Sequence, residues 1–451
     1  MPSETTALRV ETTARIDTIV AEAQAAGRVP SLVAGVVRDG RLAHLATAGD
    51  TPAPGPDTQY RIGSISKTLT ATLVMRLRDA GALGLDDLLY RHLPGTPVGG
   101  VTIRQLLGHV SGLQREPAGE WWERSAGGDV AALLDGLTAD KLSRPPYRSY
   151  HYSNLAYGLL GALLSAVTGK PWWTLVREQL LGPLGMGRTT YQATEPFARG
   201  YVVHPFDGTL REEPRHDAGA MAPAGQLWST ASDLGRWASF LADPATAGRA
   251  PDGAPVLDAA TMTEICAPVT ISDLESWTAG HGLGVELWRR GDRVYVGHTG
   301  SMPGYLAVLA AHRPSRTGVV AFANAYTMLG GGIAGLGLDL LTAVLDAEPV
   351  APAPWRPGDE PPVDVAPLVG RWWWMGREFE AGWHDGELVV RALTTPTVTP
   401  WRFTPDGTDR WRCHSGMNDG EVLEVLRAPD GTPRALDIAT FVLTRDPMTE
   451  G

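Results

Sequence analysis

Apolar residues recur with the period of a helix along much of the first 345 residues. Between residues 64 and 80, Leu69, Leu73 and Leu77 follow one another at intervals of four, which predicts an amphipathic helix with one apolar face. Comparable spacing predicts further helices along the chain. These helices span residues 8–27, 102–108, 130–137, 155–167, 172–181 and 333–345.

Short runs of β-branched and apolar residues lie on both sides of the helical region. The Asp39-Gly40 pair predicts a hairpin turn between the first two runs. The order of strands, helical insert, strands and closing helix predicts an α+β fold, in which an antiparallel sheet is flanked by helices, over residues 1–345. The predicted strands cover residues 31–37, 41–46, 283–288, 294–297, 306–311 and 318–323.

The chain changes character after residue 345. Residues 346–363 contain six prolines, which predict a stiff linker between two domains. In residues 364–451, four Asp-Gly pairs separate short aromatic and β-branched runs. This pattern predicts an up-and-down meander that closes into a small antiparallel β-barrel, with tryptophans filling its interior.

Composition and charge narrow the classes of function. The 451 residues carry a formal net charge of -11, so binding to the phosphate backbone of nucleic acids is excluded as the main task. The longest apolar stretch, residues 155–167, is shorter than the roughly 20 residues that cross a bilayer. The first residues also lack the pattern of a secretory signal. We therefore expect a cytoplasmic protein without a membrane partner, whose partner is a small molecule or a short peptide.

Cysteine and histidine usage gives no sign of a metal. The two cysteines, Cys266 and Cys413, are too few for a disulfide framework, and no C-x-x-C pair occurs. The 11 histidines do not show the spacing of metal ligands. The sequence therefore predicts no metal site.

A serine and a lysine three residues apart form the strongest candidate for chemistry. Of the 39 lysine and arginine residues only three are lysines: Lys67, Lys141 and Lys170. A lysine can lose its proton in a protein, whereas an arginine cannot, so a rare lysine is a candidate base. If Ser64 begins the predicted helix, Lys67 lies one turn further on the same face and can activate the serine hydroxyl. The alternative is an N-capping serine beside a solvated lysine.

Two further motifs contain polar residues of the types that assist a nucleophile. Tyr152 and Asn154 precede the predicted helix at residues 155–167. Their alternative role is structural, as a buried tyrosine and a helix cap. His298, Thr299, Gly300 and Ser301 follow a predicted strand, and Gly300 permits close approach of a substrate backbone. A histidine in this position also has a structural alternative.

Together these motifs resemble those of a known superfamily. The order S-x-x-K, Tyr-x-Asn and His-Thr-Gly is similar to that of the serine β-lactamases and penicillin-binding proteins, most of all the branch of class C β-lactamases, esterases and D-aminopeptidases. Residues 106–113 and 223–230 also resemble this branch, and the similarity covers residues 15–345. His298 stands where true β-lactamases usually carry lysine. The C-terminal barrel resembles lipocalin-like domains.

The resemblance implies a serine hydrolase that works through an acyl-enzyme. Ser64 would attack a substrate carbonyl, while Lys67 and Tyr152 share its proton. The backbone N–H groups of Ser64 and Ser301 would stabilise the oxyanion. No metal or organic cofactor is implied.

The resemblance also implies roles for the residues around this centre. Asn154 would hold the substrate amide, and His298 would orient Tyr152 or meet a substrate carboxylate. Thr299, Gly300 and Ser301 would bind substrate along their strand. The loops at residues 114–124 and 200–214 are expected to line the pocket.

Three functions remain open from the sequence. The first is hydrolysis of an ester, or of an amide or peptide that can contain D-residues. The second is acyl transfer, as in a penicillin-binding-protein-type thioesterase or peptide cyclase. The third is a non-catalytic ligand sensor on the same fold, which would not need an activated nucleophile. The substrate and the oligomeric state are not predicted.

Overall fold

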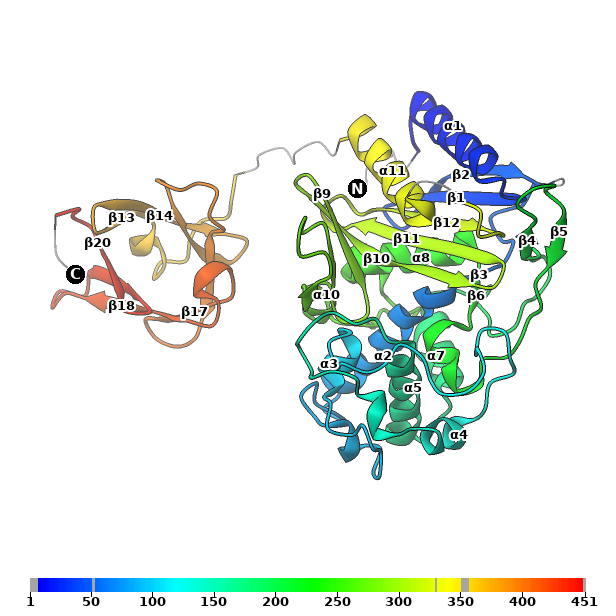
Figure 1. Cartoon of the computed structure of the whole chain (residues 1–451). Coiled ribbons are helices and arrows are strands. Elements are labelled where there is room, and N and C mark those ends of the chain that lie inside the picture. The colour runs from blue at the N-terminus through cyan, green and yellow to red at the C-terminus, as the bar shows by residue number, and fades with distance from the viewer. Residues whose placement is uncertain (1–6, 51–52, 329–330, 350–356, 449–451) are drawn as a thin grey trace. The chain divides into compact units, whose positions relative to one another are not determined.

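The computed structural model describes residues 7–50, 53–328, 331–349 and 357–448. The chain forms two compact units, Met1–Val350 and Ala351–Gly451, and each is described by itself (Figure 1). Residues 350–356 of the predicted linker lie outside the described residues.

The first unit is built on an eight-stranded antiparallel sheet. Its strand order is β2-β1-β12-β11-β10-β9-β8-β7, so the two ends of the unit meet where β1 pairs with β12. The register pairs Leu32 with Ala323 and Val36 with Val319. The strands are β1 (Ser31–Arg38), β2 (Arg41–Gly49), β7 (Thr270–Ile271), β8 (Ala279–His281), β9 (Glu286–Arg290), β10 (Arg293–Met302), β11 (Tyr305–His312) and β12 (Thr317–Ala323).

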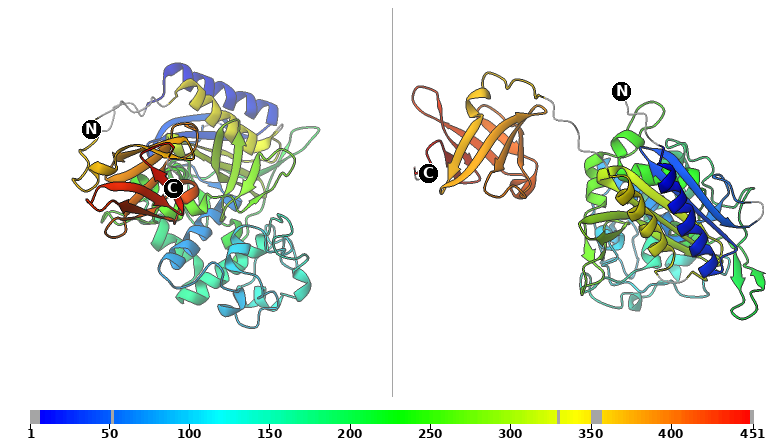
Figure 2. Two further views of the ribbon diagram at one scale, coloured as in Figure 1. Left: turned by 90° about the vertical axis from the view of Figure 1, so that its left-hand side faces the viewer. Right: turned by 90° about the horizontal axis from the view of Figure 1, so that it is seen from above.

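Helices cover both faces of this sheet because its strands are apolar on both sides. On one face, α1 (Val10–Gly27) and α11 (Gly332–Ala347) lie side by side (Figures 1 and 2). Their apolar residues form one core with the sheet, in which Ile16 and Leu340 are fully buried. On the other face, α8 (Ala231–Ala242) packs Trp237 into a second core.

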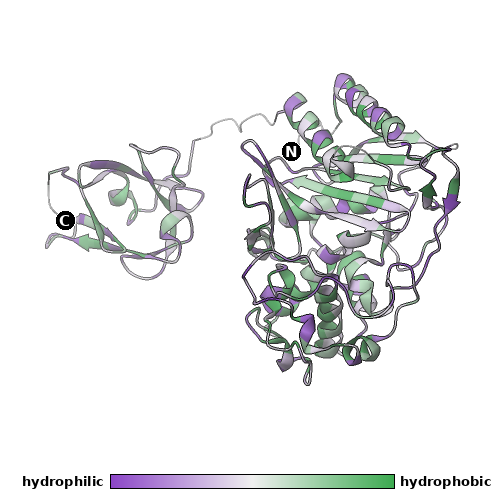
Figure 3. Ribbon diagram, viewed as in Figure 1, coloured by the Kyte–Doolittle hydropathy of each residue, from purple (hydrophilic) through white to green (hydrophobic). Residues whose placement is uncertain are grey.

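The second core continues into a helical region beside the sheet. At its centre, α2 (Ser66–Asp79) packs against α5 (Asn154–Thr168). Most residues of α5 are hydrophobic, as the colouring of Figure 3 shows. The shorter helices are α3 (Ile103–Leu107), α4 (Val130–Asp135), α6 (Trp172–Val176), α7 (Ala222–Gly225), α9 (Pro244–Ala247) and α10 (Ala259–Ile265). Two small sheets pair β3 (Tyr60–Arg61) with β6 (Trp228–Ser229) and β4 (Tyr201–Val203) with β5 (Leu210–Glu212).

The second unit is a closed eight-stranded antiparallel barrel. Neighbouring strands pair in chain order, and Trp373 of β13 pairs with Thr444 of β20 to close it. Buried side chains fill its interior, among them Trp372, whose Nε1–H donates to the carbonyl oxygen of Leu368 at 2.7 Å. The strands are β13 (Gly370–Trp374), β14 (Arg377–His384), β15 (Glu387–Ala392), β16 (Trp401–Pro405), β17 (Arg410–Cys413), β18 (Val422–Arg427), β19 (Pro433–Ile438) and β20 (Phe441–Thr444).

The predicted fold class is confirmed, with two local differences at the candidate motifs. Ser64 lies in a 3-10 turn, η1 (Gly63–Ile65), and the α-helix begins only at Ser66. The predicted strand at 294–297 extends to Met302, because its pairing with β11 continues through His298 and Ser301. Within the described residues, no helix is both long enough and apolar enough to cross a bilayer.

Candidate active site

Ser64 is the accessible residue of an otherwise buried segment. Strand β3 leads through the turn η1 into helix α2, and the residues on either side of Ser64 are buried while Ser64 itself is partly exposed. The segment is anchored because Ile62 N–H donates to the carbonyl oxygen of Leu227 at 2.9 Å. A substrate can therefore reach Ser64 while the backbone around it stays fixed.

Lys67 points at Ser64 from the first turn of α2. Its Nζ atom lies 2.9 Å from Oγ of Ser64, 2.8 Å from Oδ1 of Asn154 and 2.7 Å from the carbonyl oxygen of Ala224. The side chain has 0% exposure. Burial lowers the pKa of Lys67 to about 7, and the negative charge of Glu116 opposes that fall.

These three contacts suit a neutral amine. The oxygens of Asn154 and Ala224 can only accept hydrogen bonds, so they take the two N–H groups of an uncharged Lys67. The nitrogen lone pair is then left for the Ser64 hydroxyl. This is the arrangement that a general base needs in order to accept the serine proton.

Asn154 connects the lysine to a loop. Its Nδ2–H donates to Oε1 of Glu116 at 2.8 Å, and Oε2 of Glu116 accepts from Nε1–H of Trp122 at 2.8 Å. Asn154 is the first residue of α5, which is capped by Ser153 through its contact with the N–H of Ala156 at 3.1 Å. The cap of α5 therefore sets the position of Asn154 beside Lys67.

Tyr152 lies over the lysine. The Nζ atom of Lys67 lies 4.9 Å from the centre of the Tyr152 ring, and the His109 ring stacks on the tyrosine with centres 4.3 Å apart. Burial raises the pKa of the Tyr152 phenol well above its usual value, which the neighbouring Ser64 side chain partly opposes. The phenol is therefore protonated near neutral pH.

His298 is a buried, neutral histidine in β10. Its Nδ1 lies 2.5 Å from the carbonyl oxygen of Thr299, and its ring centre lies 6.2 Å from that of Tyr152. Burial, followed by the positive charge of Lys67, lowers the pKa of His298 to about 3. The imidazole thus adds no positive charge at neutral pH.

Two glycines let β10 approach the serine. A Cβ on Gly300 would lie 1.9 Å from the carbonyl oxygen of Ile62 and 3.2 Å from the backbone nitrogen of Ser64. A Cβ on Gly63, whose φ is +50°, would lie 2.5 Å from the backbone nitrogen of Ser301. Only glycine fits at either position, and the segments that carry the Ser64 and Ser301 amides therefore lie against each other.

Glu286 is a site residue that the sequence analysis missed. It lies on β9 opposite Gly297, and its Oε1 accepts from the Thr299 hydroxyl at 2.9 Å while its Oε2 accepts from the Thr299 N–H at 3.3 Å. Burial raises the pKa of Glu286. In the sequence it alternates with the apolar Val285 and Leu287, which is equally typical of a solvent-exposed strand residue.

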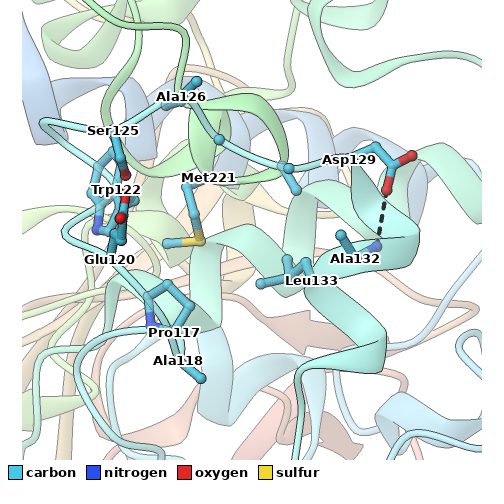
Figure 4. Close-up of a pocket in the computed structure, with 14 residues that line it drawn as sticks. Pro117, Ala118, Glu120, Trp122, Ser125, Ala126, Asp129, Ala132, Leu133 and Met221 are labelled. Atoms are coloured by element: carbon cyan, nitrogen blue, oxygen red, sulfur yellow. Dashed lines mark hydrogen bonds between the residues drawn. The ribbon is translucent and has the colours of Figure 1, made fainter.

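The loop at residues 114–124 was expected to line the pocket, and it brings Glu116 and Trp122 to the site. Trp122 also lines a cavity of about 290 Å³ (Figure 4). Pro117, Glu120 and Met221 also line this cavity. The Trp122 ring also lies 3.2 Å from where a Cβ on Gly225 would lie.

The second predicted loop, residues 200–214, is more exposed. It carries the hairpin of β4 and β5 and lies beside the sheet, where Tyr201 N–H donates to the carbonyl oxygen of Asn324 at 2.9 Å. Glu213 pairs with Arg124 of the first loop, which joins the two loops. Across the described ranges, no group of three or more His, Cys, Asp or Glu residues has the arrangement of a metal site.

Comparison with known proteins decides the family. The family model described as Beta-lactamase matches residues 16–343. The chain belongs to the beta-lactamase family. The predicted resemblance is confirmed, and the first unit has the fold of beta-lactamase-type serine hydrolases.

Curated relatives span much of the chain. Penicillin-binding protein 4 of Amycolatopsis lactamdurans is 32% identical over 372 residues, which are 76% of this chain and 92% of the relative. Beta-lactamase-like protein 2 of Dictyostelium discoideum is 26% identical over 328 residues, 68% of this chain. The chain matches only 58% of that longer relative.

A solved structure has the same family fold. The D-stereospecific amidohydrolase from Streptomyces sp. is 27% identical, with a TM-score of 0.62 over 73% of this chain and 98% of the amidohydrolase. Residues 361–445, which include the barrel, match a domain family of unknown function, DUF7586.

Proposed function

We propose that the protein is a serine hydrolase that forms an acyl-enzyme at Ser64, acting on an ester or on an amide or peptide that can contain D-residues. The observation that carries this proposal is the contact of 2.9 Å between the Lys67 amine and the Ser64 hydroxyl. The lowered pKa of Lys67 supports it, because a neutral amine is required at the start of the reaction.

In the acylation step, the Oγ atom of Ser64 bonds to the substrate carbonyl carbon as its proton passes to the nitrogen of Lys67. The negative charge moves to the carbonyl oxygen. Backbone N–H groups of Ser64 and Ser301 are proposed to stabilise that oxygen, which the close approach of their segments supports. Asn154 keeps Lys67 in place and, in this proposal, also binds the substrate amide.

Tyr152 is proposed as the acid. When the tetrahedral intermediate collapses, the bond to the leaving group breaks and the leaving atom takes a proton from the phenol, which Lys67 then restores. The raised pKa of Tyr152 supports this division of roles, since the phenol carries its proton before the reaction. Deacylation repeats the sequence with water in place of serine.

His298 fits an orienting role in this scheme. His298 is buried and neutral, so it has no positive charge to pair with a substrate carboxylate. Its ring lies close to that of Tyr152, which favours a role in orienting the phenol. Thr299, Gly300 and Ser301 are proposed to bind substrate along β10, with Thr299 already bonded to Glu286.

The charge around Ser64 favours substrates with an amino group. Glu116, Glu123 and Glu286 act on Lys67 as negative charges and Arg115 acts as a positive one, so negative charge predominates near the reacting centre. This negative charge would stabilise a cationic amine on the acyl part of the substrate. The similarity to a D-stereospecific amidohydrolase supports the inclusion of D-residues among the candidates.

Labelling and product analysis test the proposal. A fluorophosphonate should add one adduct to the intact protein, and Ser64→Ala should abolish it. The labelled protein should lose activity on a panel of p-nitrophenyl esters and of D- and L-amino-acid p-nitroanilides. Products measured with and without an added amine distinguish hydrolysis from acyl transfer. An unlabelled wild-type protein that turns over none of the panel contradicts the proposal and favours a ligand sensor.

A further inference from the structure

The carboxylate of Glu286, on β9, is bonded to β10 at Thr299. It accepts both hydrogen bonds that Thr299 can donate, from the hydroxyl at 2.9 Å and from the N–H at 3.3 Å. It also lies 3.4 Å from Nδ1 of His298. The donors of Thr299 are therefore already bound to a carboxyl group of the protein, and both of its oxygens act as acceptors, as in the ionised form.

The titratable groups around Glu286 carry no positive charge that would offset its negative charge toward an incoming ligand. His298 and His281 are the imidazoles that face it, and burial lowers the pKa of each to about 3, so both are neutral. Lys67 is neutral in the reactive state of the proposed mechanism. The Glu286 charge also acts on Tyr150 and Tyr152. The pKa values of both phenols are raised, so both are uncharged.

The charge of Glu286 also affects the residues around the Ser64 hydroxyl. The charge of Glu286 is among those that act on Lys67 and on Tyr152. Strand β10, which carries Thr299, continues to Gly300, and Gly300 lies against the segment of Ser64. A substrate bound along β10 therefore meets this carboxylate.

We propose that Glu286 is a specificity-determining residue that excludes substrates with a carboxylate on the leaving group and favours those with a neutral or cationic leaving group. The inference rests on the proposed function at Ser64. A substrate carboxylate at Thr299 would find its donors occupied and would lie beside a like charge in a buried site, which opposes binding. An amide, an amine or an uncharged ester in the same place meets no such repulsion.

Two esters with the same acyl group test the inference. One has a 3-carboxyphenyl leaving group and the other a 3-carbamoylphenyl leaving group, which differ in charge and little in shape. We expect the wild-type protein to prefer the carbamoyl ester in kcat/KM by about tenfold or more. Glu286→Gln keeps the side-chain shape and removes the charge, and should reduce that preference at least about fivefold. Glu22→Gln, on the exposed side of α1, is the matched control and should leave the preference unchanged.

The outcomes separate this inference from the function on which it rests. A wild-type preference near one overturns the inference whatever the variants do, so it stays testable if Glu286→Gln fails to fold. If a folded Glu286→Gln protein is still labelled at Ser64 by the fluorophosphonate and keeps the wild-type preference, the role of Glu286 is overturned and the proposed function at Ser64 is not. A wild-type protein that is neither labelled nor active on either ester overturns both.

Discussion

The Nζ atom of Lys67 lies 2.9 Å from the Oγ atom of Ser64, three positions earlier in the chain. The contact spans the junction of the turn η1 and helix α2, where a separation of three residues brings two side chains to the same face. Since Lys67 is fully buried, the amine has few partners besides this hydroxyl and two acceptor oxygens.

Lys67→Arg should abolish most of the activity. Arginine keeps the positive charge but has no accessible neutral form, so it cannot accept the serine proton. We expect acylation, measured by stopped-flow release of the leaving group, to fall by a factor of about 10² to 10⁴. Lys170→Arg is the control, because Lys170 is an exposed residue paired with Glu178. A Lys67→Arg protein with nearly wild-type acylation would show that Lys67 carries no proton.

The pH dependence of kcat/KM should report the lysine. The pKa of Lys67 is lowered to about 7, so the protonated, inactive form dominates below that pH and the neutral base above it. Activity should therefore rise as the pH is raised through about 7, falling about tenfold for each unit below it. A pH series on an uncharged ester checks this. A flat profile between about pH 5 and 9 would contradict a titrating Lys67.

Tyr152→Phe should slow the reaction and leave the protein folded. The phenyl ring keeps the stacking on His109 at 4.3 Å but removes the hydroxyl that is proposed to protonate the leaving group. We expect kcat/KM to fall by about 10² or more for amides, which need an acid. Esters of acidic phenols should lose less, because their leaving groups need no proton. Equal losses for both substrate classes would argue against Tyr152 as the acid.

Gly300→Ala should disrupt the contact between β10 and the Ser64 segment. The added methyl would lie 1.9 Å from the carbonyl oxygen of Ile62, so one of the two backbones must shift. Fluorophosphonate labelling and the melting temperature should both fall. Gly187→Ala is the control, since a Cβ at Gly187 meets no atom within 4 Å. A Gly300→Ala protein that melts and reacts like the wild type would mean that the strand tolerates the methyl.

The local patterns of the sequence were enough to predict the architecture. The apolar period of α2, the Asp-Gly turns of the barrel and the strands at both ends of the first unit all appear in the structure. They could be predicted because each depends on neighbours close in sequence: a helix face on every third or fourth residue, and a turn on two adjacent residues. The start of α2 and the length of β10 differed from prediction. The turn before α2 lies against Ser301 of a distant segment, and β10 is longer because its pairing with the next strand, β11, continues as far as Met302.

The motif residues could be identified one by one, but the sequence contained no signal for their surroundings. Ser64, Lys67, Tyr152, Asn154 and His298 stand out by residue type and spacing. Glu116 and Glu286 do not, because an acidic residue in a loop or between apolar strand residues is usually solvated. Their placement beside Lys67 and Thr299 arises only when α5, the loop after α3 and strand β9 pack together.

The sequence alone thus determined which groups are available for the chemistry: a hydroxyl and a rare amine one turn apart, with a phenol, an amide and an imidazole further along. Tertiary structure alone decided their state. Burial removes water from Lys67, Tyr152 and His298, and taking a charge out of water is costly. The pKa values of the amine and the imidazole therefore fall, and the phenol keeps its proton. No spacing along a chain contains that information, because desolvation is the sum of contacts from every segment packed around the group.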